Sequence, residues 1–76
     1  MKQTKDKITR YADGDFIIEI VEAEKDFEAW IGHSHRGISR LMFSEEKTSF
    51  TREEFRDLVV SNLARYKDIY RQEYLN

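Results

Sequence analysis

The stretch Phe50-Thr51-Arg52-Glu53-Glu54-Phe55 marks the start of a helix and divides the chain into two unlike halves. Thr51 and Glu54 have the spacing of a capping box, in which each side chain accepts a hydrogen bond from the other residue's backbone amide. Phe50 and Phe55 occupy the two positions of a hydrophobic staple around the same start. Two independent signals therefore predict a helix that begins here.

Apolar and tyrosine side chains continue beyond this start at steps of three and four residues, which is the spacing of one helical face. The chain contains no Pro, and its 3 glycines all precede the capping box. Nothing in the sequence interrupts the helix, so we expect it to cover residues 51–75. The residues on the predicted face are Phe55, Leu58, Val59, Leu63, Tyr66, Ile69, Tyr70 and Tyr74.

The first half of the chain has the character of short strands joined by tight turns. Asp13-Gly14 favours a type I′ hairpin turn, and Glu24-Lys25 is a second candidate turn. Between them lies Phe16–Val21, a segment rich in β-branched residues. Residues 34–37 form a third loop. The expected strands cover residues 7–12, 15–22, 27–33 and 38–43.

Short loops between consecutive strands favour an antiparallel meander. The chain is therefore predicted to be α+β, with three to four antiparallel strands followed by one long helix on one sheet face, in the order ββββα. We expect a single domain over 1–76, in which residues 1–6 are disordered, 7–44 form the meander and 51–75 form the helix.

Strand alternation predicts that both faces of the sheet are apolar. One helix covers only one face, so the other face would be too apolar for ordinary solvated surface. We expect one face to carry Tyr11, Phe16, Ile18, Ile20, Phe27, Ala29, Ile31, Ile38 and Met42. We expect the other to carry Ile8, Ile17, Val21, Trp30, Leu41 and Phe43, with Arg10, Glu19, Glu28 and Ser39.

Composition and charge exclude several classes of function. The 76 residues include no Cys, which excludes a disulfide scaffold and a cysteine zinc site. No segment approaches the roughly 20 apolar residues of a membrane span. The 13 basic and 15 acidic residues are evenly mixed, whereas binding to nucleic acid normally needs a basic cluster. We expect a small, soluble, cytoplasmic bacterial protein.

Residues His33, Ser34, His35 and Arg36 form the one segment with metal- or anion-binding chemistry. The two histidines could share a metal ion, but zinc needs three or four ligands and the chain has no third His or Cys. A nucleophilic role for Ser34 would need a positioned base and an oxyanion hole, and nothing marks either. We therefore predict no enzyme activity, no cofactor and no metal, with His33 and His35 as weak candidates.

The candidate partner-binding residues are aromatic, apolar or amphipathic side chains on the second sheet face or on the last turns of the helix. Tyr and Trp suit surfaces where one end of the side chain is buried and the other is wet, and Trp and Arg are frequent in binding hot spots. Asn62 interrupts the apolar helical face and needs a partner if buried. The candidates are Trp30, Arg40, Leu41, Phe43, Asn62, Tyr66, Tyr70 and Tyr74.

These features favour a non-catalytic protein–protein interaction module, with a homodimer as one candidate assembly. Its contacts would come from the second sheet face and the tyrosine-rich end of the helix. Two alternatives stay open. One is a nucleic-acid-binding βββα-type domain that uses Arg10, Arg36 and Arg40, and the other is a metal- or anion-binding site in the loop from His33 to Arg36.

Overall fold

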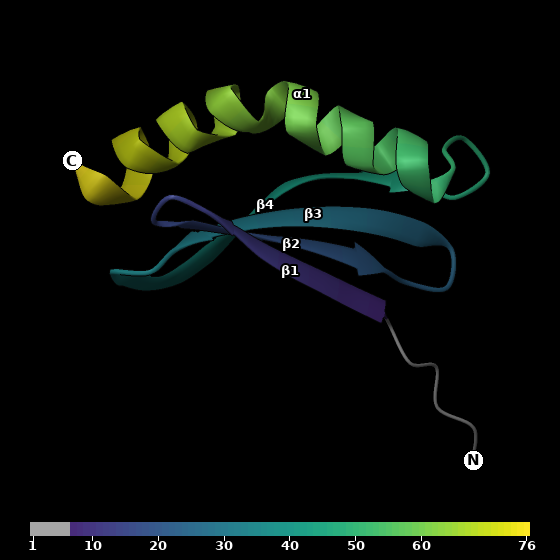
Figure 1. Ribbon diagram of the computed structural model, residues 1–76, viewed down its shortest axis with the longest axis horizontal. Helices are drawn as coiled ribbons and strands as arrows, with labels where there is room; N and C mark the ends of the chain where they lie inside the picture. The colour runs from purple at the N-terminus through teal and green to yellow at the C-terminus, as the bar shows by residue number, and fades with distance from the viewer. Residues whose placement is uncertain (1–6) are drawn as a thin grey trace, which may run out of the picture.

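The computed structural model describes residues 7–76 and has the predicted ββββα architecture (Figure 1). The predicted disorder of residues 1–6 lies outside the described residues. Helix α1 lies across one face of a single antiparallel sheet and leaves the opposite face uncovered (Figure 1). In sheet order, the elements are β1 (Lys7–Asp13), β2 (Phe16–Glu22), β3 (Asp26–His33) and β4 (Arg36–Glu46), then α1 (Arg52–Tyr70) and a π-helical turn, η1 (Arg71–Leu75).

The capping box forms as predicted and sets the first residue of α1. The Glu54 amide donates to the Thr51 hydroxyl at 3.1 Å, and the Thr51 amide donates to the Glu54 carboxylate at 2.8 Å. Phe50 is half-buried and Phe55 is buried, as the hydrophobic staple requires. Local chemistry therefore fixes where the helix begins, independently of the sheet.

The turn between β1 and β2 differs from the prediction by one residue on each strand. Asp13 pairs with Phe16, so the two loop residues are Gly14 and Asp15. Gly14 has φ +63°, and no other described residue has a positive φ. A type I′ turn needs positive φ at both loop residues, whereas type II′ needs it only at the first, where glycine is preferred. Because both strands shift by one residue, each side chain keeps its predicted face.

In β4 the prediction of alternating faces is wrong for Phe43. Ala29 pairs with Phe43 and Trp30 pairs with Leu41, so Met42 is an extra residue in a β-bulge. The bulge lets Met42 and Phe43 both pack with the core, while Leu41 stays on the opposite face. Ile38, predicted on the covered face, lies beside a second register shift and is 38% exposed.

The core lies between α1 and the covered face, and aromatic contacts dominate it. Phe55 stacks on Phe27 with ring centroids 5.1 Å apart and meets the edge of Phe43 at 5.5 Å. Tyr70, at the other end of the helix, meets the edge of Phe16 at 5.9 Å. The helix is thus held at both ends. The buried residues are Phe16, Ile18, Phe27, Ala29, Ile31, Met42, Phe55, Val59 and Tyr70.

Truncation of Phe55 tests this packing. Phe55 has no exposed surface, and we expect Phe55→Ala to lower the free energy of unfolding by about 3–5 kcal/mol. Val60, on the same helix, is 61% exposed, so Val60→Ala should change it by no more than about 0.5 kcal/mol. Urea denaturation measures both. Equal losses in the two variants would contradict this assignment of the core.

An ion-pair cluster predicts how stability changes in acid. The Glu22 carboxylate lies 2.9 Å from Arg52 Nε and 3.1 Å from Lys47 Nζ, and the hydrogen bond from Arg52, then that from Lys47, lowers the pKa of Glu22. Because the pKa of Glu22 is lower in the folded state than in the unfolded state, its ionised form stabilises the fold at pH values above the ordinary pKa of glutamate. This contribution disappears as the pH falls through the lowered pKa.

The wild type should therefore lose more stability than Glu22→Gln when the pH falls from about 6 to 3. Glu24→Gln, which removes an exposed carboxyl group in the neighbouring turn, is the control and should follow the wild type. Thermal melts across this pH range make the comparison. A Glu22→Gln variant as acid-sensitive as the wild type would show that this cluster is not coupled to folding.

Candidate binding surface

The face of the sheet that points away from α1 is the candidate site, and we call it the open face. Its residues alternate along each strand with the buried residues, so they fall into rows across the sheet. From β1 to β4 the rows are Ala12–Ile17–Gly32–Ser39, Arg10–Glu19–Trp30–Leu41 and Ile8–Val21–Glu28–Ser44.

The middle row combines a neutralised ion pair with the largest apolar side chains of the open face. Arg10 is paired with Glu19 on the neighbouring strand, with its Nε 2.7 Å from the carboxylate. Trp30 donates from Nε1 to the Glu28 carboxylate at 3.0 Å, which fixes the orientation of the indole. Leu41, the cross-strand neighbour of Trp30, is 40% exposed. The middle row therefore offers the apolar pair Trp30 and Leu41 beside an arginine that is already paired with a carboxylate.

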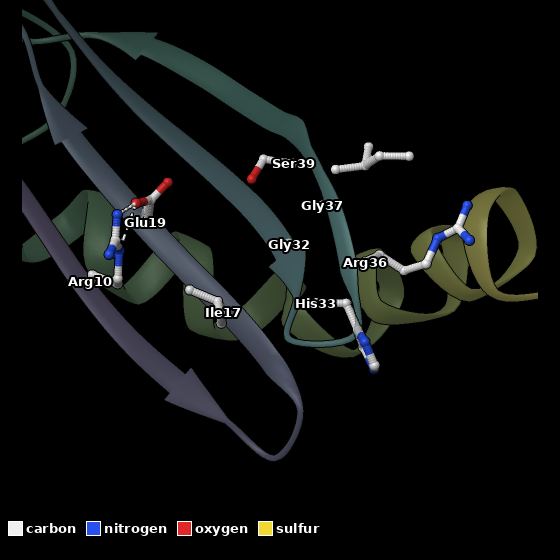
Figure 2. Close-up of a pocket in the computed structure, with 9 residues that line it drawn as sticks. Arg10, Ile17, Glu19, Gly32, His33, Arg36, Gly37 and Ser39 are labelled. Atoms are coloured by element: carbon white, nitrogen blue, oxygen red, sulfur yellow. Dashed lines mark hydrogen bonds and ion pairs between the residues drawn. The ribbon is translucent and has the colours of Figure 1, made fainter.

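Gly32 creates a shallow hollow of about 310 Å³ beside this row (Figure 2). Gly32 has no side chain, and a Cβ atom at this position would lie 3.0 Å from the Ser39 hydroxyl. Figure 2 views the sheet with the helix behind it, with the Arg10–Glu19 pair on one side of the hollow and Ser39 on the other. The lining residues are Arg10, Ile17, Glu19, Gly32, His33, Arg36, Gly37, Ile38 and Ser39.

The two histidines lie at the end of the β3–β4 hairpin. The His33 ring meets the edge of Phe16 at 5.1 Å and stacks on Tyr70 at 6.3 Å. Its Nδ1 accepts a hydrogen bond from the His35 amide at 3.1 Å. Across residues 7–76, no three His, Cys, Asp or Glu side chains come close enough to hold a metal ion. His33 is therefore positioned by aromatic packing and by the turn.

The predicted partner-binding residues do not form one surface. Trp30 and Leu41 are neighbours on the open face. Arg40 lies on the helix side of the sheet, where its Nε donates to Glu73 at 2.7 Å and its guanidinium lies 5.8 Å from the Tyr66 ring centroid. This contact ties the end of the helix to β4.

Phe43, Tyr70 and Asn62 have partners inside the molecule. Phe43 packs against Phe55 and Tyr66. Tyr70 has no exposed surface, and its hydroxyl donates to the Ile38 carbonyl at 2.5 Å; burial raises the pKa of this phenol. Asn62 donates to the Leu58 carbonyl at 2.8 Å, one turn earlier in the same helix. None of the three presents a group that requires a second molecule.

Tyr74 and Tyr66 are the members of the tyrosine series that keep a solvent-facing part. Both are half-buried, and the Tyr74 ring lies 4.8 Å from that of Tyr70. Sequence reasoning did not predict the hollow over Gly32 or the pairing of Arg10 with Glu19. A glycine inside an apolar strand signals a close approach or a gap in the side-chain surface, and this signal could have identified the hollow.

Of the three arginines of the nucleic-acid hypothesis, Arg10 and Arg36 line the same hollow, whereas Arg40 lies on the helix side of the sheet. Arg10 is paired on the open face, and Arg40 is paired on the helix side. Arg36 points away from Arg10 in Figure 2. Nucleic-acid affinity depends on several cations that meet one phosphate backbone, and this arrangement does not place all three arginines on one surface.

Comparison of the chain with protein-family models, with curated proteins and with solved structures finds no match. Within residues 7–76, no helix is both long enough and apolar enough to cross a membrane. The physical properties of the surface therefore carry the functional argument.

Trp30, as the sole tryptophan, reports directly on the open face. We expect acrylamide to quench its fluorescence in the folded protein at an intermediate rate, because the indole is half-buried. The protein in denaturant provides the fully accessible reference. A folded protein that resists quenching as strongly as a core tryptophan would contradict the assignment of Trp30 to the open face.

Proposed function

We propose that the chain is a non-catalytic module that binds another protein through its open face. One observation carries this proposal: five apolar side chains lie on a face that α1 does not cover. They are Ile8, Ile17, Val21, Trp30 and Leu41. Large apolar side chains gathered on one uncovered sheet face are typical of interaction sites.

The charges of the open face favour a protein partner over a nucleic acid. Arg10 is neutralised by Glu19, and Glu28 adds a further carboxylate beside Trp30. Such a surface would repel a phosphate backbone, whereas an apolar centre with a tryptophan and a polar rim is typical of protein interfaces. The hollow over Gly32 offers a recess for one partner side chain.

The chemistry-bearing side chains support a binding role rather than a catalytic one. The His33 ring is packed against Phe16 and Tyr70, and its Nδ1 is engaged by the following turn. Ser34 and His35 are exposed at the hairpin end, where water has free access and a reacting group would lack a closed pocket. A bacterial, cytoplasmic setting belongs to the same proposal.

Site-specific photocrosslinking in the natural host tests the proposal with a closely matched control. A photoreactive amino acid replaces Leu41, which is 40% exposed on the open face, or Leu75, which is 38% exposed at the end of η1. We expect a discrete protein adduct from position 41 and none from position 75. Trp30→Ser should remove that adduct, because it deletes the neighbouring anchor without touching the core.

Three results would contradict the proposal. The first is equal adducts from both positions, which would indicate random collisions. The second is an adduct from position 41 that persists in the Trp30→Ser variant. The third is an adduct with nucleic acid. Circular dichroism of each variant establishes that the fold is intact before the comparison is made.

A further inference from the structure

β1 is an edge strand whose outer side has no cover among the described residues. It occupies one end of the sheet order and pairs with β2 over seven residues without a register shift. β4, at the other edge, is interrupted by two register shifts. Bulges of this kind protect sheet edges from pairing with other chains. β1 lacks this protection.

The hairpin register shows which backbone groups of β1 face the free edge. In a hairpin with a two-residue loop, the residues that flank the loop form a hydrogen-bonded pair, and here these are Asp13 and Phe16. Hydrogen-bonding directions alternate along a strand. The amides and carbonyls of Ile8, Arg10 and Ala12 are therefore directed away from β2, toward the edge.

We propose that β1 pairs antiparallel with β1 of a second copy of this chain, centred on Arg10. In this register Arg10 lies opposite the second copy's Arg10, and Ile8 lies opposite its Ala12. Both are pairs whose backbone groups face the edge, so about six hydrogen bonds can form between the copies. The two sheets then become one sheet with a two-fold axis through Arg10.

Charge complementarity selects this register. It places Lys7 opposite the second copy's Asp13 at both ends of the paired segment. The Asp13 carboxylate lies 2.6 Å from Lys67 Nζ of its own copy and would be shared with the incoming Lys7, and opposite charges across strands stabilise a sheet. The two Arg10 side chains meet at the centre, but each is already neutralised by its own Glu19. A shift by two residues in either direction leaves Lys7 or Asp13 opposite an uncharged residue of β1.

The helix side of β1 is also incompletely packed. The Tyr11 hydroxyl is buried and has no hydrogen-bond partner among residues 7–76. The ring borders a gap of about 270 Å³ that is lined by Arg56, Asp57 and the exposed Val60. A second copy would place its Thr9 opposite Tyr11 on this side and extend the sheet beneath the gap.

This pairing goes beyond the proposed function because it defines how two copies assemble. The two-fold axis is perpendicular to the sheet, so both helices lie on one side and both open faces lie on the other. The binding surface would double in area without any change within the chain. An edge contact of this size is small, and we expect a weak dimer with a dissociation constant on the order of micromolar.

A charge exchange tests the register by sedimentation equilibrium at protein concentrations from about 10 µM to 1 mM. Lys7→Asp places two carboxylates opposite each other at both ends, and we expect dimerisation to weaken about tenfold. The double variant Lys7→Asp/Asp13→Lys restores opposite charges between copies and should recover the wild-type constant within about threefold. Lys25→Asp, an equal charge change in the β2–β3 turn, should leave it unchanged.

A cysteine pair of experiments provides an independent readout, since the chain has no natural Cys. Residues directly opposite in a hydrogen-bonded pair have Cα atoms about 5.5 Å apart, within the range of a disulfide. Arg10→Cys should therefore form a covalent dimer under oxidation. Ala12→Cys should not, because the two copies of residue 12 lie about four residues apart along the strands.

A strictly monomeric protein at the highest concentration would overturn the proposal. So would a dimer that Lys7→Asp leaves unchanged, or one that the double variant fails to restore while circular dichroism shows an intact fold. A dimer lost on Leu41→Ser but kept in Lys7→Asp would place the contact on the open face instead. These experiments test the pairing of two copies through β1. The photocrosslinking experiment tests the binding of another protein to the open face, so either proposal can fail without the other.

Discussion

The structure depends on one constraint: a single amphipathic helix covers only one face of a four-stranded sheet. The stacked Phe27–Phe55 pair and the buried Tyr70 hold α1 against that face from both ends. The strands are nevertheless apolar on both faces, as Trp30 and Leu41 illustrate. Burial on one side thus leaves apolar surface on the other, and association is the general way in which proteins cover such surface.

Local chemistry determined the parts of the fold that could be predicted from the sequence. The capping box of Thr51 and Glu54 needs only neighbouring residues, and it forms as expected. The first hairpin was predicted one residue too early on each strand, because the actual turn depends on the positive φ of Gly14. The position of Phe43 could not be read from strict alternation, since the bulge at Met42 depends on pairing with β3.

The candidate site was predictable as a surface but only in part as a set of residues. Trp30 and Leu41 lie together on the open face, where alternation placed them. The tyrosines of the helix recur at the same four-residue spacing, yet Tyr70 is fully buried while Tyr66 and Tyr74 are half-buried. Arg40, a predicted partner-binding residue, lies on the helix side of the sheet and forms an ion pair with Glu73. Such differences arise because side chains on the same helical face are buried to different extents against the sheet. Helical periodicity predicts the face of a residue but not the extent of its burial.

Solution NMR with a soluble paramagnetic reagent tests the asymmetry between the two faces most directly. We predict strong relaxation enhancement for the methyl groups of Ile8 and Leu41 on the open face, and little for Ile18, Ile31 and Val59 beneath the helix. A dilute sample keeps the chain monomeric, so that each signal reports on a single copy. Equal protection of both groups of methyls, or the reverse pattern, would contradict the claim that this sheet presents an uncovered apolar face.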